Sequence, residues 1–225
     1  MFGLGKKDNR DYKDQRLFMV EKLKRWDYLK SERVAEAMNS VPRHLFLPED
    51  QRRYAYEDRP LPVGKNQTIS APHMVAMMSD ALDLKGDEKV LEIGAGTGYH
   101  ACVVGHILKE GSVYSIEKIK TLAQRAKENI EGAGCTNVEV IIGDGTLGFK
   151  EEAPYDRIFV TAAAPAIPEP LLDQLKPGGL LLIPVGSRYA QDLISVKKSV
   201  NGKIKRKNLC GCIFVPLVGR YGWSV

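Results

Sequence analysis

The chain has 225 residues, of which 44% are hydrophobic and 27% charged, ordinary values for a soluble globular protein. Its length suits one domain over residues 1–225. No apolar run reaches the roughly 18–20 residues that span a bilayer, and the polar start, MFGLGKKDNRDYKD, lacks the apolar core of a signal peptide. We therefore expect a monomeric cytoplasmic protein with no membrane contact.

The net charge of +5 is unevenly distributed, since residues 193–225 hold seven basic and no acidic side chains. Such a segment suits binding to nucleic acid or to acidic peptides. It also suits a solvated hairpin whose lysines protect an exposed strand edge. We favour the hairpin and expect no nucleic-acid partner.

The four cysteines are Cys102, Cys135, Cys210 and Cys212. Only the last two are close in sequence, and their C-x-C spacing does not match a zinc site. We expect four free thiols and no metal.

We expect the first 84 residues to form an N-terminal, mainly helical segment. Residues 14–40 have helical spacing of apolar side chains, with Ser31 as a possible N-cap inside the stretch. Residues 41–64 contain four prolines and are expected to form an ordered but irregular connector. A further helix is predicted over 72–84, with Pro72 in its first turn and Ser70 or Ala71 near its cap.

Residues 85–185 alternate between segments with a strand pattern and segments with a helix pattern. Strands are predicted at 89–94, 112–117, 138–144, 156–162 and 180–185, with helices at 98–109, 121–131 and 168–176 between them. Pro177-Gly178-Gly179 is expected to end the last helix. This alternation predicts an α/β fold with a doubly wound, mostly parallel sheet. Residues 186–225 follow as an antiparallel edge hairpin turning at Asn201-Gly202.

A glycine-rich loop, Gly94-Ala95-Gly96-Thr97-Gly98, joins the first of these strands to its helix. Glycine permits a tight turn and lets a ligand approach the backbone. Acidic residues end successive strands beside it: Glu117 can accept hydrogen bonds from two ribose hydroxyls, and Asp144 in Gly143-Asp144-Gly145 from an adenine amino group. Each acid alone is equally consistent with a solvated strand end or a helix cap.

The G-x-G-x-G spacing, with Glu92 two residues earlier, differs from the G-x-G-x-x-G of dinucleotide loops. Acidic groups around the loop suit S-adenosylmethionine, which has no phosphate. Residues 85–185 thus resemble a Rossmann-like class I methyltransferase. Thr161–Pro165 lack the Asn/Asp-Pro-Pro-aromatic motif of many amino-group methyltransferases, and no cysteine nucleophile is evident. A carboxylate acceptor, already an anion at neutral pH, fits this region because it needs no general base.

Several motifs are similar to those of the protein-L-isoaspartate O-methyltransferase family across residues 15–222. They are VPRHLF (41–46), AYEDRPLPVG (55–64), QTIS (67–70), VLEIGAGTGY (90–99), GDG (143–145), APYDRIFVTAAAP (153–165) and FVPLVG (214–219). The resemblance implies methylation of the α-carboxylate of L-isoaspartyl residues in damaged proteins and peptides. The ester then collapses to a succinimide, which begins repair. Asn66 and Ala95 depart from residues frequent in the family.

By this resemblance Ser70 is the catalytic residue. The predicted cofactor-binding residues are Gln67, Thr68, His73, Glu92, Gly94, Ala95, Gly96, Thr97, Gly98, Glu117, Gly143 and Asp144. We expect Ser70 to position the substrate carboxylate and not to act as a nucleophile, since no residue is marked as an orienting partner for His73. The alternative for Ser70 is a helix cap. The alternative functions are an RNA or small-molecule methyltransferase and a non-catalytic nucleotide-binding module.

Overall fold

The computed structural model describes residues 5–224. The N-terminal segment begins with two helices, α1 (Gly5–Arg25) and α2 (Glu32–Ser40), followed by two 3-10 turns, η1 (Arg43–Phe46) and η2 (Glu49–Tyr54). The helical prediction for residues 14–40 is confirmed. Ser31 occupies the N-cap of α2, but its side chain makes no capping hydrogen bond.

The connector contains structure that the proline pattern concealed. Strands β1 (Leu61–Gly64) and β2 (Gln67–Ile69) form a separate two-stranded antiparallel sheet. Lys65 and Asn66 make its turn with positive φ values of 56° each, a conformation that glycine usually supplies. The expectation of an irregular connector over residues 41–64 was therefore wrong for its last four residues, which form β1. This small sheet leads directly into helix α3 (Pro72–Ala81), whose N-cap is Ala71.

The main sheet has seven strands in the order β5-β4-β3-β6-β7-β8-β9. Its strands are β3 (Lys89–Ile93), β4 (Ser112–Glu117), β5 (Val138–Ile142), β6 (Tyr155–Val160), β7 (Leu175–Gly186), β8 (Gln191–Lys198) and β9 (Ile204–Cys212). The first five pair in parallel, and β8 and β9 are antiparallel. The predicted doubly wound sheet with an antiparallel edge hairpin is confirmed.

Helices α4 (Tyr99–Ile107), α5 (Lys120–Gly132) and α6 (Glu169–Gln174) connect the strands. Short 3-10 turns η3 (Gly145–Leu147) and η4 (Lys150–Glu152) lie between β5 and β6. Helix α6 ends before the predicted Pro177-Gly178-Gly179, which instead lies inside the long strand β7. The pairing of β6 with β7 shifts register opposite this stretch, which accommodates the proline.

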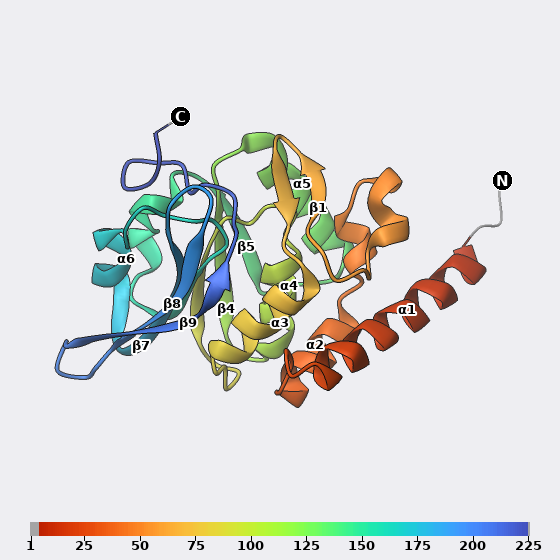
Figure 1. Cartoon of the computed structure of the whole chain (residues 1–225), viewed down its shortest axis with the longest axis horizontal. Helices are drawn as coiled ribbons and strands as arrows, with labels where there is room; N and C mark the ends of the chain where they lie inside the picture. The colour runs from red at the N-terminus through yellow and green to blue at the C-terminus, as the bar shows by residue number, and fades with distance from the viewer. Residues whose placement is uncertain (1–4, 225) are drawn as a thin grey trace.

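Two apolar clusters cover the two faces of the sheet. One joins side chains of α1 to α5 to alternate strand residues such as Val90 and Val113. The other joins α6 to the intervening residues, such as Leu91 and Ile93. Figure 1 shows α1 and α2 on one side of the molecule and α6 with β7 to β9 on the other. None of the helices in residues 5–224 combines the length and apolarity that a membrane span needs.

The cysteine expectation was wrong for one pair. Cys102 of α4 and Cys135, just after α5, form a disulfide across 33 residues of sequence. The fold brings them together because α4 and α5 pack side by side on the same face of the sheet. Cys210 and Cys212 are free thiols. The side chains that the structure describes, those of residues 11–224, include no cluster of three or more His, Cys, Asp or Glu residues that could hold a metal ion.

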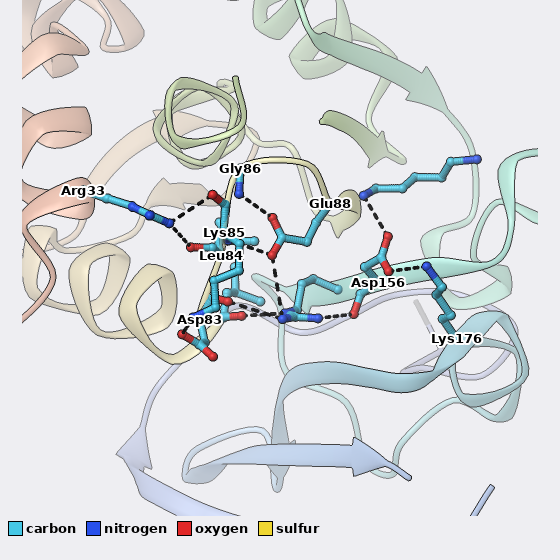
Figure 2. A network of polar contacts seen from close by, with 11 residues as sticks. Arg33, Asp83, Leu84, Lys85, Gly86, Glu88, Asp156 and Lys176 are labelled. Atoms are coloured by element: carbon cyan, nitrogen blue, oxygen red, sulfur yellow. Dashed lines mark hydrogen bonds and ion pairs between the residues drawn. The ribbon is translucent and has the colours of Figure 1, made fainter. Parts of the chain in front are cut away.

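A polar network fixes the turn that carries the chain from α3 into β3 (Figure 2). Glu88 accepts hydrogen bonds from the backbone N–H groups of Lys85 and Gly86, and Arg33 donates to the carbonyls of Leu84 and Lys85. Asp156 at the start of β6 accepts from Lys176 at 2.7 Å. The network lies at the amino ends of β3 and β6, so it stabilises the end of the sheet opposite to the glycine loop.

Candidate active site

The order of strands reverses at β3, which lies between β4 and β6. In open parallel sheets such a switch point leaves a crevice beyond the carboxyl ends of the strands. A cavity of about 360 Å³ lies at this place. Its lining comes from separate parts of the chain: residues 67–70 and 75 of the N-terminal segment, 92–97 and 99–100 around the glycine loop, 116–119 at the end of β4, 145, 161–162 after β6, and 215–218.

The glycine loop has its shape because two positions exclude any other residue. Gly94 has φ +97°, and a Cβ there would collide with the Thr161 side chain. Gly98 has φ +90°, forms the N-cap of α4, and would bring a Cβ to 2.8 Å from the Ile130 side chain. Thr161 also donates a hydrogen bond to the Gly94 carbonyl at 2.6 Å. The loop is therefore held from both sides and leaves its backbone facing the cavity.

Glu117 at the end of β4 is bound to this loop. One carboxylate oxygen accepts from the Gly96 N–H at 2.8 Å and the other from the Ile119 N–H at 2.9 Å. Burial raises the pKa of Glu117, and these backbone N–H groups partly oppose the rise. A carboxylate has about four acceptor sites, so Glu117 keeps capacity for hydroxyl groups of a ligand.

Glu92, two residues before the loop, is fully buried and also lines the cavity. The Ser115 hydroxyl donates a hydrogen bond to one of its oxygens. Burial raises the pKa of Glu92 to about 8. The hydrogen bond from Ser115 acts in the opposite direction, and the negative charge of Glu117 raises the pKa further. The carboxyl group is therefore largely protonated at neutral pH.

Buried polar atoms without partners gather around the cavity. In residues 11–224, the part of the chain with described side chains, six buried side-chain atoms lack a hydrogen-bond partner, and four belong to residues that line the cavity: Glu92, Thr97, Tyr99 and His100. Native proteins satisfy nearly all buried polar groups, so such a concentration is typical of a ligand site. The acidic side chains of the lining suit a ligand without phosphate groups, and the glycine loop offers it backbone groups. Both features fit S-adenosylmethionine.

Of the residues predicted from sequence, nine line this cavity: Gln67, Thr68, Ser70, Glu92, Gly94, Ala95, Gly96, Thr97 and Glu117. Ser70 lies between β2 and α3, and the helix cap is its neighbour Ala71. The capping alternative for Ser70 therefore loses its basis. The roles of all these residues remain predictions.

Four predicted residues do not line the cavity: His73, Gly98, Gly143 and Asp144. The carboxylate of Asp144 accepts from Thr146 and from the Arg220 backbone N–H at 2.9 Å. Burial raises the pKa of Asp144, but these hydrogen bonds outweigh it, and the pKa is lowered. The neighbouring Gly145 lines the cavity instead.

His73 has an orienting partner that the sequence did not reveal. Both its backbone N–H and its ring Nδ1 lie 2.9 Å from the same oxygen of Asp58. Its ring lies 5.2 Å from that of Tyr28. The lack of an orienting partner for His73 was therefore the wrong ground for excluding Ser70 as a nucleophile, since Asp58 is such a partner. Among residues 11–224, however, no hydrogen bond joins His73 to Ser70, and His73 does not line the cavity.

Other lining residues were missed by the sequence analysis, among them Tyr99, His100, Lys118, Thr161 and residues 215–218. His100 lies next to the glycine loop; burial, with the charge of Arg43, lowers its pKa to about 3, so its ring is neutral. The motif FVPLVG contained the signal for residues 215–218, but a single sequence does not show that this segment returns to the chain just after β6, where Pro216 bridges Ala163.

The fold and the cavity together define a class I methyltransferase with a Rossmann-like sheet. A solved protein-L-isoaspartate O-methyltransferase matches with a TM-score of 0.84 and 32% identity, covering 92% of this chain and 67% of that one. A second, from Plasmodium falciparum in complex with S-adenosyl-L-homocysteine, matches with a TM-score of 0.80 and 29% identity over 90% of this chain and 98% of that one.

The family model described as protein-L-isoaspartate(D-aspartate) O-methyltransferase matches residues 14–222. The chain belongs to this family. Among its relatives, the protein-L-isoaspartate O-methyltransferase of Hyperthermus butylicus is 53% identical, covering 96% of this chain and 94% of the relative. That of Methanothrix thermoacetophila is 58% identical, covering 86% and 91%.

Proposed function

We propose that this chain transfers a methyl group from S-adenosylmethionine to the α-carboxylate of L-isoaspartyl residues in damaged proteins and peptides, the first step of their repair. The supporting observation is that Ser70 and the glycine loop line one cavity, although 23 residues lie between Ser70 and Gly94 in the sequence. Family membership over residues 14–222 supports the same reaction. A second reading as an RNA methyltransferase has no such observation in its favour.

One wall of the cavity would bind the cofactor, and the opposite wall would position the substrate. The loop backbone and Glu117 would hold the adenosine part of the cofactor, since their N–H and carboxylate groups match its hydroxyl and amino groups. When bound, S-adenosylmethionine supplies a methyl group that is electrophilic because it is attached to a sulfonium. Apolar side chains, including Val75, Ile116 and Leu217, line the same cavity and limit access of water.

Ser70 acts on the other wall. Its hydroxyl donates a hydrogen bond to one oxygen of the substrate carboxylate, which aims the other oxygen at the methyl carbon. That oxygen forms the new bond as the carbon–sulfur bond breaks, and the electron pair of the broken bond remains on sulfur. No proton has to be removed, because a carboxylate with a pKa near 4 is already ionised. Catalysis therefore rests on proximity and orientation.

The test is methyl transfer from labelled cofactor to an isoaspartyl peptide, beside its aspartyl twin and bulk RNA. We expect label only in the isoaspartyl peptide, released by base as methanol because the product is an ester. In the Ser70→Ala variant, turnover should fall by roughly ten- to a thousandfold while calorimetry shows nearly unchanged affinity for S-adenosylhomocysteine. Label in RNA or in neither peptide would overturn the proposed function. Wild-type turnover in Ser70→Ala would refute only the role of Ser70.

We expect the protein to act as a monomer in the cytoplasm, and to have isoaspartyl proteins and no nucleic acid as partners. Sedimentation of the purified chain at several concentrations tests the first, since a dimer would shift the boundary with concentration.

A further inference from the structure

Arg43 is a fully buried arginine that connects three separate segments of the chain. It begins η1 and has no exposed surface. Its Nε donates to the Ala55 carbonyl and its Nη2 to the Ser70 carbonyl, both at 2.8 Å. Its guanidinium carbon lies 4.9 Å from the ring centre of Tyr99, the first residue of α4. One side chain therefore bridges the connector, the segment of Ser70 and the helix after the glycine loop.

The burial of Arg43 destabilises the fold, and a role in packing alone does not account for it. Among residues 11–224, whose side chains the structure describes, no carboxylate lies within ion-pair distance of it, and its Nη1 is buried without a hydrogen-bond partner. Burying an unpaired guanidinium costs free energy that an apolar side chain of similar length would avoid. Burial also lowers the pKa of Arg43, against the influence of Tyr99, Tyr56 and Asp58. An arrangement that costs stability is typical of a residue with a functional role.

The contacts of Arg43 fall on both walls of the cavity. Ser70 and Tyr99 both line it, one on the substrate side and one beside the glycine loop. Ser70 follows a strand of only three residues in a sheet that is not hydrogen-bonded to the main one. Its backbone therefore depends on side-chain anchors for its position relative to the loop.

We propose that Arg43 is a positioning residue for methyl transfer: by binding the Ser70 carbonyl while it stacks on Tyr99, it sets the distance between the Ser70 hydroxyl and the cofactor wall. This inference rests on the proposed function. A fixed carbonyl restricts the backbone of Ser70, and with it the direction of the hydroxyl. Since the reaction needs orientation and not acid–base chemistry, a small displacement of this hydroxyl lowers turnover strongly.

Two variants separate the hydrogen bonds from the charge. Arg43→Lys keeps the cation but cannot hold two carbonyls and a ring with a planar fork. Arg43→Met keeps the length and removes both. We expect kcat for the isoaspartyl peptide to fall about ten- to a hundredfold in Arg43→Lys and further in Arg43→Met. Affinity for S-adenosylhomocysteine by calorimetry should change less than about threefold, and KM for the peptide less than kcat, because Arg43 does not contact the loop or Glu117.

Arg157 supplies a matched structural control. It too donates to backbone carbonyls, those of Leu82 at 2.6 Å and Asp83 at 3.3 Å, but at the opposite end of the sheet. The network around it includes Glu88 and Asp156 (Figure 2). Arg157→Lys and Arg157→Met should lower the unfolding temperature and leave kcat within twofold of wild type. All variants are assayed well below the lowest unfolding temperature, so that the folded fraction does not enter the comparison.

A kcat within twofold of wild type in Arg43→Lys would overturn the proposal, and so would an equal loss of kcat in the Arg157 variants. If Arg43→Met does not fold, the lysine variant still decides. The wild-type measurement separates this inference from the proposed function. Active wild type with active Arg43 variants refutes the positioning role alone, whereas inactive wild type refutes the function on which it rests.

Discussion

Glu92 is a carboxyl group with no exposed surface, and its titration is linked to folding. Its pKa rises from the usual 4.5 to about 8 because of burial, so the folded state prefers the protonated form. Below about pH 4.5 both folded and unfolded chains bind the proton. Between about pH 4.5 and 8 only the unfolded chain loses it, and the contribution of Glu92 to stability therefore falls as pH rises.

Glu92→Gln removes this titration while keeping the shape and a carbonyl oxygen for Ser115. From pH 5 to 8 the free energy of unfolding of wild type should fall relative to that of the variant, by at most about 1.4 kcal/mol per pH unit. Urea unfolding of both proteins at each pH measures the difference. Parallel pH dependences would show that Glu92 is ionised in the folded protein.

At the scale of elements, helix α3 begins without a capping side chain of its own, since its N-cap is Ala71. Asp58 of the connector takes this role by accepting from the His73 N–H. Burial raises the pKa of Asp58, but the hydrogen bonds from His73 outweigh it and hold the pKa below its usual 3.8. A carboxyl group whose pKa is lowered in the folded state stabilises the fold at pH values above its unfolded-state pKa. This stabilisation is lost as the pH falls through the folded-state pKa.

Asp58→Ala should therefore lower the free energy of unfolding by about 1–2 kcal/mol at neutral pH, the usual cost of losing a helix cap. Below pH 3.8 the gap to wild type should narrow. Asp58→Asn, which keeps an acceptor oxygen, should lose less. Thermal unfolding followed by circular dichroism gives the comparison, and a stability of Asp58→Ala equal to that of wild type would exclude the capping role.

At the scale of the molecule, elements with regular apolar patterns were predictable from sequence, and features set by tertiary packing were not. Strands β3 to β6 begin within one residue of their predicted starts, because buried side chains dictate their pattern. The β1–β2 hairpin was missed because Lys65 and Asn66 make a turn that usually needs glycine. Asp144 was assigned to the cavity by residue type, but its carboxylate is bound to Thr146 and to the returning chain end.

The basic hairpin of β8 and β9 projects from the sheet edge (Figure 1), and residues 203–208 are exposed. We expect neutralising Lys203, Lys205 and Arg206 together to leave kcat within twofold, since none of them lines the cavity. Bulk RNA should bind neither protein tightly at physiological salt. Tight RNA binding by wild type, lost in the triple variant, would instead assign the hairpin to nucleic acid.

The cavity wall formed by residues 215–218 has a consequence for how the protein is made. These residues line the site next to a parallel β-bridge between Ala163 and Pro216. The Trp223 indole N–H stabilises this arrangement by donating a hydrogen bond to the Ala163 carbonyl at 3.0 Å. During translation the glycine loop and all parallel strands leave the ribosome before this wall exists. A chain that stops before residue 215, by premature termination or by trimming from its end, therefore retains most of the sheet but has an open, incomplete site. We infer that activity appears only after residues 215–218 have been synthesised and have packed beside Ala163.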